Sequence, residues 1–129
     1  MQGQRPGRMS YPREVVIVDD ERDILEVLAD VLRDEGYTPV VFRDGIEALT
    51  YLTEREPALL LTDLRLPSMS GEELITHVRS HYSPLLPVVV ISGAATTEVV
   101  RRLSIQDVLM KPFELDTFLA LVQRWAPLQ

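Results

Sequence analysis

Short runs of apolar residues alternate along the chain with longer segments in which apolar residues recur every three to four positions. The short runs are typical of buried β-strands, and the three-to-four-residue period is typical of amphipathic helices. The pattern predicts five strands, at residues 15–18, 39–42, 58–62, 87–91 and 107–110. It predicts a first helix that starts with Asp20 and Asp23 in a capping box and stops at Gly36, followed by helices at 45–54, 71–82, 96–103 and 114–125.

Strict alternation of strands and helices determines the predicted class of fold. Parallel strands need crossover connections, and helices supply them with a right-handed sense. The chain is therefore expected to be an α/β protein with a parallel sheet covered by helices on both faces. Ligands of such folds bind beyond the carboxyl ends of the strands, so functional residues are expected at those ends.

The N-terminal end of the chain differs from the rest. Residues 1–12 mix Gly, Pro, Gln and Arg without periodicity, which predicts a flexible N-terminal arm. The periodic pattern then continues to the end of the last predicted helix, which predicts one folded domain over residues 13–127. A chain of 129 residues fits a single domain of this kind.

Composition and charge narrow the possible partners. The net charge of −7 argues against direct binding of nucleic acid, which needs a basic surface, and favours protein partners. The chain has no cysteine, which is consistent with a cytoplasmic protein. No apolar run approaches the roughly 18 residues of a membrane span, so no membrane association is expected.

Charged and hydroxyl residues follow the predicted strands. They occupy the carboxyl ends of four strands, at Asp19, Asp20, Asp63, Ser92 and Lys111, the only lysine in the chain. Converging carboxylates repel one another unless a cation joins them, and an all-oxygen set without histidine or cysteine favours Mg²⁺. We interpret Asp63 as a carboxylate nucleophile for phosphorus, with Lys111 and Ser92 stabilising the charge of the transferred group.

These residues lie in motifs that resemble the receiver domain of two-component response regulators. The motifs are VIVDDE at 16–21, LLLTDLRLPSMSG at 59–71, VISG at 90–93 and MKPF at 110–113. The resemblance covers about residues 14–126 and implies a flavodoxin-like, doubly wound sheet with strand order 2-1-3-4-5.

The resemblance also implies a role for each site residue. Asp63 would accept a phosphoryl group from a histidine kinase or a histidine phosphotransfer protein. Ser92 and Lys111 would bind that group, and Mg²⁺ would be held by carboxylates and one backbone carbonyl, from Asp19, Asp20, Asp63 and Arg65. The chain would then be a regulator that signals to a downstream protein or a covalently linked domain. The only reactions it would catalyse are its own phosphorylation and dephosphorylation.

Two departures from the family pattern concern the surface that would carry the signal. Val108 stands where receivers usually carry Tyr or Phe, so the usual aromatic switch is absent. The stretch from Ser92 to Lys111 is about three residues shorter than is common, which predicts a short fourth helix. We therefore expect phosphorylation to alter the order or packing of that helix. The face from helix four to helix five is a candidate surface for a homodimer.

Other functions and sites are compatible with the same sequence. A receiver-like adaptor that works without phosphorylation and an aspartyl-phosphate phosphatase are the two rival functions. His77 and His81 have the i, i+4 spacing of a metal-binding pair, but a solvated helix face is the default interpretation without a third ligand. Arg101 and Arg102 are by default an exposed helix face, and Trp125 is expected to pack unless a partner covers it.

Overall fold

The chain folds into a five-stranded parallel sheet with helices on both faces. The computed structural model describes residues 8–93 and 97–128. Its elements are, in order, β1 (Met9–Val18), α1 (Arg22–Asp34), β2 (Thr38–Phe42), α2 (Gly45–Leu52), β3 (Arg55–Asp63), α3 (Gly71–His81), β4 (Val88–Ser92), α4 (Thr97–Arg102), β5 (Asp107–Met110) and α5 (Leu115–Trp125). The strand order is β2-β1-β3-β4-β5 and every pairing is parallel, which confirms the predicted fold class.

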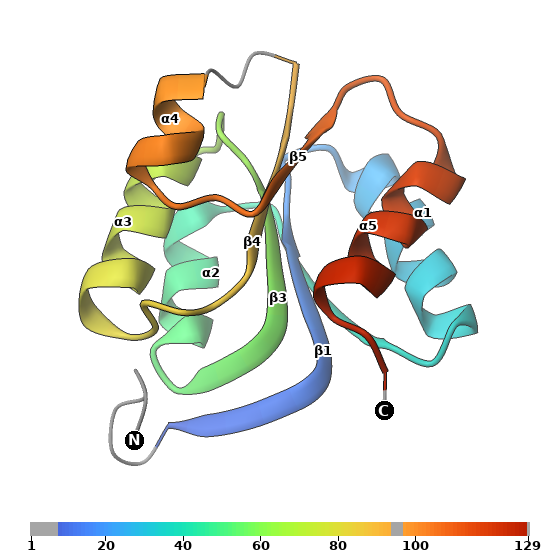
Figure 1. Cartoon of the computed structure of the whole chain (residues 1–129), viewed down its shortest axis with the longest axis horizontal. Coiled ribbons are helices and arrows are strands. Elements are labelled where there is room, and N and C mark those ends of the chain that lie inside the picture. The colour runs from blue at the N-terminus through green and yellow to red at the C-terminus, as the bar shows by residue number, and fades with distance from the viewer. Residues whose placement is uncertain (1–7, 94–96, 129) are drawn as a thin grey trace.

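Side chains that alternate along each strand build two separate cores. Ile17, Leu61 and Ile91 face one side of the sheet and pack with α1 and α5, where Phe118 is fully buried. The neighbouring residues face the other side and pack with α2, α3 and α4. Figure 1 shows this division, with α1 and α5 on one side of the strands and α2, α3 and α4 on the other. Burial on both faces explains why the central strands read as continuous apolar runs.

The first strand is longer than the sequence predicts. Met9, Ser10 and Tyr11 pair with the start of β3, and an irregularity separates this pairing from the regular register that begins at Val15. Arg8 is buried, and its guanidinium donates to the carbonyl oxygen of Leu52 at 2.8 Å. The predicted flexible arm is therefore wrong for residues 9–12, which belong to the sheet, while residues 1–7 lie outside the described residues.

The start of α1 also differs from its prediction. Glu21, not Asp20, is the N-cap residue, and its side chain makes no capping hydrogen bond. Instead, Asp19 Oδ1 accepts a hydrogen bond from the backbone N–H of Glu21 at 2.9 Å. The predicted capping box between Asp20 and Asp23 is wrong because Asp19, which directly follows β1, supplies this contact, and the exposed Asp20 side chain is left available for another role.

The remaining elements agree with the prediction to within a few residues. β3 begins earlier, at Arg55, and α2 ends earlier, at Leu52. α4 spans six described residues, so the fourth helix is short, as expected; Thr96, its predicted first residue, lies outside the described residues. None of the helices in the described part of the chain is long and apolar enough to cross a membrane.

Candidate functional site

The carboxyl ends of the strands bring the predicted acids and the lysine together. Asp19 directly follows β1, Asp63 ends β3 and Lys111 directly follows β5. Asp19 is fully buried and Asp63 is 9% exposed, so both carboxylates lie below the surface of the cleft. Their convergence from positions far apart in the sequence follows from the parallel sheet, in which all strand ends of one kind meet at one edge.

The Lys111 ammonium group bridges the two buried acids. Its Nζ lies 2.8 Å from Asp63 Oδ2 and 2.9 Å from Asp19 Oδ2. Burial alone would lower the pKa of Lys111, but hydrogen bonds with Asp63 and Asp19 outweigh burial and raise the pKa above its usual value. Lys111 is therefore a fixed positive charge at neutral pH. The peptide bond between Lys111 and Pro112 is cis.

Three carboxylates are arranged so that they could hold one metal ion. Oxygen atoms of Asp19, Asp20 and Asp63 lie within 4.8 Å of one another. The donor set is all oxygen, which suits a hard divalent cation such as Mg²⁺. Asp20 is exposed, and the guanidinium of Arg43 fixes its backbone by donating to the Asp20 carbonyl oxygen at 3.0 and 3.1 Å. The residues present therefore fit a Mg²⁺ site.

The loop after β3 holds Asp63 in place. The backbone N–H of Arg65 donates to Asp63 Oδ1 at 3.1 Å, and the Thr62 hydroxyl donates to the Asp63 carbonyl oxygen at 2.8 Å. Gly71, the first residue of α3, packs against the backbone of Asp63 so closely that an added Cβ would lie 2.1 Å from the Asp63 carbonyl oxygen. Each Asp63 carboxylate oxygen thus has a partner, and the backbone beneath it is tightly confined.

Ser92 lies at the end of β4, next to β3. Ser92 is buried, and its backbone carbonyl oxygen accepts a hydrogen bond from the Lys111 backbone N–H at 3.1 Å. Ser92 is paired with Met110 in the sheet, one residue before Lys111. The sheet therefore places Ser92 and Lys111 on adjacent strand ends, as the sequence predicts; Val108, at the position of the missing aromatic residue, is partly buried in β5.

Sequence reasoning did not assign a role to Glu21 or Arg43. Glu21 Oε1 lies 3.4 Å from Lys111 Nζ, so the ammonium has a third acidic neighbour. The position of Glu21 directly after two acids was a signal for this role, because the turn that presents those acids also carries the next side chain. Arg43 gave no such signal, because its contact with the Asp20 backbone depends on the pairing of β2 with β1.

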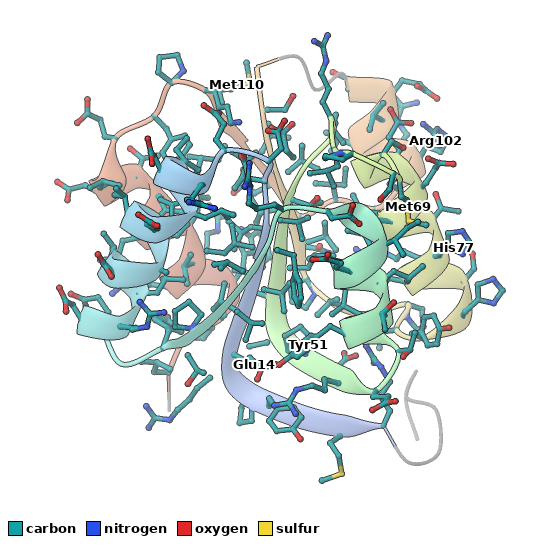
Figure 2. All side chains as sticks on the ribbon, turned by 180° about the vertical axis from the view of Figure 1, so that it is seen from behind. Glu14, Tyr51, Met69, His77, Arg102 and Met110 are labelled. Carbon is teal, nitrogen blue, oxygen red and sulfur yellow. The ribbon has the colours of Figure 1, made fainter. Side chains whose placement is uncertain are left out.

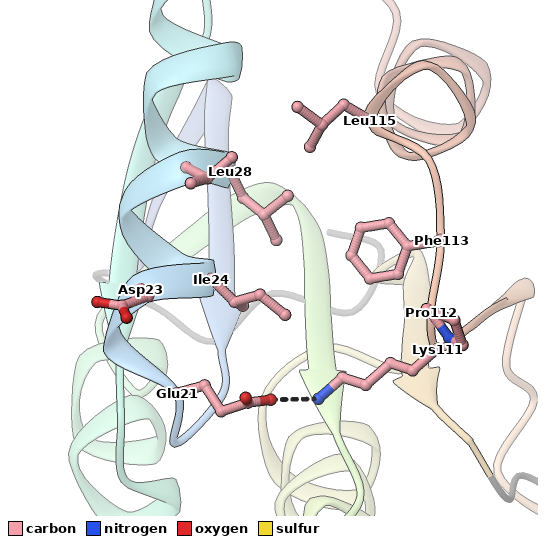
Figure 3. Close-up of a pocket in the computed structure, with 9 residues that line it drawn as sticks. Glu21, Asp23, Ile24, Leu28, Lys111, Pro112, Phe113 and Leu115 are labelled. Atoms are coloured by element: carbon pink, nitrogen blue, oxygen red, sulfur yellow. Dashed lines mark hydrogen bonds and ion pairs between the residues drawn. The ribbon is translucent and has the colours of Figure 1, made fainter.

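A groove runs from Lys111 along α1. It has a volume of about 550 Å³ and lies between the first turns of α1 and the segment that connects β5 to α5. Figure 3 shows the side chains of Ile24, Leu28 and Phe113 facing one another across it, with Glu21 and Lys111 at one end. An apolar groove therefore opens directly beside the charged cleft.

Asp19→Asn is expected to stabilise the metal-free protein. Burial raises the pKa of Asp19, although its hydrogen bonds with Glu21 and Lys111 oppose the shift. When the pKa of a carboxyl group is higher in the folded protein than in the unfolded chain, the protein loses stability as the pH rises through that folded-state pKa. At neutral pH the negative charge of Asp19 therefore opposes folding. Lys111 keeps Asp63 as a partner in the variant.

The measurement is the thermal unfolding midpoint at pH 7 with a chelator present. Asp34→Asn removes the same charge from an exposed position at the end of α1 and is the matched control. A midpoint lower than that of the wild-type chain would contradict the account, because it would mean that the ion pair contributes more than burial of the charge costs.

Comparison with known proteins places the chain in a family. A family model, the response regulator receiver domain, matches residues 15–123, so the chain belongs to the receiver domain family of two-component response regulators. The DNA-binding transcriptional regulator NtrC of Escherichia coli is 34% identical over 113 residues, which cover 85% of this chain and 24% of NtrC. Chemotaxis response regulator CheY4 of Vibrio cholerae has a similar structure, with a TM-score of 0.81 and 26% identity, covering 86% of this chain and 96% of that chain.

A second solved structure bears on the metal. The receiver domain of sensor histidine kinase PA1611 from Pseudomonas aeruginosa holds a magnesium ion in its active site cleft; it has a TM-score of 0.79 and 25% identity, covering 88% of this chain and 97% of that chain. This chain spans about a quarter to a half of the length of the first curated relatives that it matches, and several of those are named as DNA-binding regulators. The expectation that this chain itself does not bind nucleic acid therefore stays a prediction.

Proposed function

We propose that this domain accepts a phosphoryl group on Asp63 from a phosphohistidine of a sensor histidine kinase or a histidine phosphotransfer protein, and then signals to a partner protein or a linked domain. The observation that carries the proposal is the contact of 2.8 Å between Asp63 Oδ2 and Lys111 Nζ, with the carboxylates of Asp19 and Asp20 beside it. A nucleophilic carboxylate, a fixed ammonium and a cation-binding acid pair are the parts that phosphoryl transfer to an aspartate needs.

The reaction breaks one bond and forms another. An Asp63 carboxylate oxygen attacks phosphorus, the bond between phosphorus and the donor imidazole nitrogen breaks, and its electron pair returns to that nitrogen. The product is an acyl phosphate on Asp63. Asp19, Asp20, Asp63 and the backbone carbonyl of Arg65 would hold Mg²⁺, which when bound supplies positive charge to the phosphoryl oxygens.

Two side chains of this domain would stabilise the transferred group directly. The Lys111 ammonium is already at Asp63 and would donate to a phosphoryl oxygen, which reduces the charge that builds up during transfer. The Ser92 hydroxyl, at the neighbouring strand end, would donate to a second oxygen. A phosphoryl group brings as many as about two negative charges into a cleft that is already acidic. The acyl phosphate therefore depends on these donors to stabilise its charge.

The apolar groove supports a protein as the phosphoryl donor. It is lined by Ile24, Val27, Phe113 and Leu115, and residues Val27 and Leu115 are 46% and 43% exposed. A partner helix that covered these side chains would gain the free energy of apolar burial next to the cleft. We propose that the phosphohistidine protein docks there and presents its imidazole to Asp63.

The test is Mg²⁺-dependent labelling by acetyl phosphate, followed by intact mass spectrometry. The wild-type chain should gain about 80 Da, one phosphoryl group, and lose it in hydroxylamine, which cleaves acyl phosphates but not serine phosphates. Asp63→Asn should gain nothing, whereas Asp34→Asn should be labelled like the wild-type chain. Labelling that persists in Asp63→Asn would overturn the assignment, and absence of labelling with every donor would favour an adaptor that works without phosphorylation.

The output surface is proposed to be α4, β5 and α5. Met110 on β5 is 53% exposed, and the six-residue α4 is held to α3 by an ion pair of 2.7 Å between Arg102 and Glu72. The Arg79 guanidinium also donates to the carbonyl oxygens of Leu103 and Ser104, which fixes the end of α4. We propose that phosphorylation changes the packing of α4 and that a second copy of the domain or another protein binds to this face. We also propose that the domain works in the cytoplasm.

A further inference from the structure

The exposed side of α3 carries a pair of histidines that the proposed phosphorylation chemistry does not use. His77 and His81 are both exposed, four residues apart, in the last part of the helix. Their ring centroids are 5.9 Å apart and their planes are inclined by 31°. Figure 2 shows His77 on the outer surface of α3. The two rings are therefore neighbours on one face of the helix, as the i, i+4 spacing predicts.

We propose that His77 and His81 chelate a borderline divalent transition-metal ion, such as Cu²⁺, Ni²⁺ or Zn²⁺. Imidazole nitrogens bind such ions at about 2.0–2.1 Å, which places two ring centroids about 5 Å apart when both rings share one ion. The separation of 5.9 Å is within about an ångström of that value, so small side-chain rotations close the chelate. Water fills the other coordination positions.

The local charges favour a cation at this place. His81 is the last residue of α3, where the helix dipole presents its negative end and where a positive charge is stabilised. The guanidinium of the basic neighbour in the same turn, Arg79, donates to carbonyl oxygens of the segment between α4 and β5. In the described part of the chain no third histidine, cysteine or acid joins the pair in a metal-sized cluster, so a two-ligand site is expected.

The ligand type separates this site from the acidic cleft. Mg²⁺ prefers oxygen ligands and binds imidazole poorly, whereas affinity for nitrogen ligands rises along the first-row series to Cu²⁺. The two sites are also apart in space. Gly71 touches the Asp63 backbone, and His81 follows it by ten residues, which is about 15 Å of helix.

The test is calorimetric titration of the full chain with Cu²⁺ while Mg²⁺ is present in excess. The wild-type chain should bind one ion, with a paramagnetic resonance spectrum that shows two nitrogen ligands. Removing one ligand makes binding monodentate, so His77→Ala and His81→Ala should each weaken binding by about 10²-fold. Asp63→Asn should bind Cu²⁺ like the wild-type chain, which separates this inference from the proposed phosphorylation.

A relocated histidine gives the matched control. The double variant His77→Ala with Thr76→His keeps two histidines but places them five residues apart, at positions 76 and 81, on different faces of the helix. It should bind as weakly as His81→Ala. Wild-type affinity in the relocated variant, or in either single variant, would overturn the proposal, because the chelate would then not be the source of binding.

Discussion

Lys111→Met is expected to slow phosphorylation by acetyl phosphate by about 10²–10³-fold, the usual cost of removing one group that stabilises charge in the transition state. Methionine keeps much of the length of the side chain but removes the ammonium that lies within 2.9 Å of both Asp19 and Asp63. Lys111 is the only lysine of the chain, so no neighbouring lysine replaces it. The measurement is the rate of mass gain at saturating Mg²⁺.

Two further variants distinguish charge from position. Arg22→Met removes one positive charge from an exposed place in the first turn of α1 and should leave the rate unchanged. Lys111→Arg keeps the charge but replaces a compact ammonium with a planar fork that is too large to sit between two acids in the same way. It should remain well below the wild-type rate. A Lys111→Met rate within a few-fold of the wild-type rate would contradict the role given to the ammonium.

The fold could be predicted from the sequence because its signal is local and repeated. Each central strand is a run of β-branched and other apolar residues, and each following segment carries a helical period, so the alternation determines the class. The site followed from the same logic, because in a parallel sheet the residues after the strands must meet. Asp19, Asp63 and Lys111 were therefore brought together by topology, without any local motif that links them.

The parts that prediction missed depend on contacts that leave no periodic pattern in the sequence. The extension of β1 contains Pro12 and polar residues and has no strand pattern of its own; it is held by pairing with Arg55 and by the buried Arg8. The capping box failed because Asp19, rather than Asp20, bonds to the backbone at the start of α1. The partner that decides the β1 extension is distant in sequence, whereas the acid that decides the start of α1 is the immediate neighbour of the predicted one.

The close packing at the start of α3 shows how strongly the position of Asp63 depends on backbone contacts. Gly71 is buried, and its N–H donates to the Leu64 carbonyl oxygen at 2.9 Å. On the opposite side of this loop, Asp44 caps α2 and accepts a hydrogen bond from Ser68, which has a positive φ of 65°. The segment that presents Asp63 is therefore confined between the starts of α2 and α3, so its position responds to changes in either helix.

Gly71→Ala is expected to lower the free energy of unfolding by about 3 kcal/mol. The added Cβ would lie 2.1 Å from the Asp63 carbonyl oxygen and 2.9 Å from the Leu64 Cα. Both are backbone atoms, which cannot turn aside as a flexible side chain would. In an open helix the same change would be favourable by about 1 kcal/mol, because alanine has the higher helix propensity. Here the steric cost exceeds that gain.

The measurement is urea unfolding, combined with the labelling rate of the fraction that remains folded. Gly93→Ala is the matched control, because its Cβ would meet nothing closer than the Lys111 carbonyl oxygen at 4.0 Å. Its stability should stay within about 1 kcal/mol of the wild-type value. To relieve the clash, either α3 or the Asp63 backbone must move. A movement of the Asp63 backbone would disturb the contacts of Asp63 with Arg65 and Lys111. Folded Gly71→Ala should therefore also be labelled more slowly, whereas wild-type stability and rate would show that α3 shifts without strain.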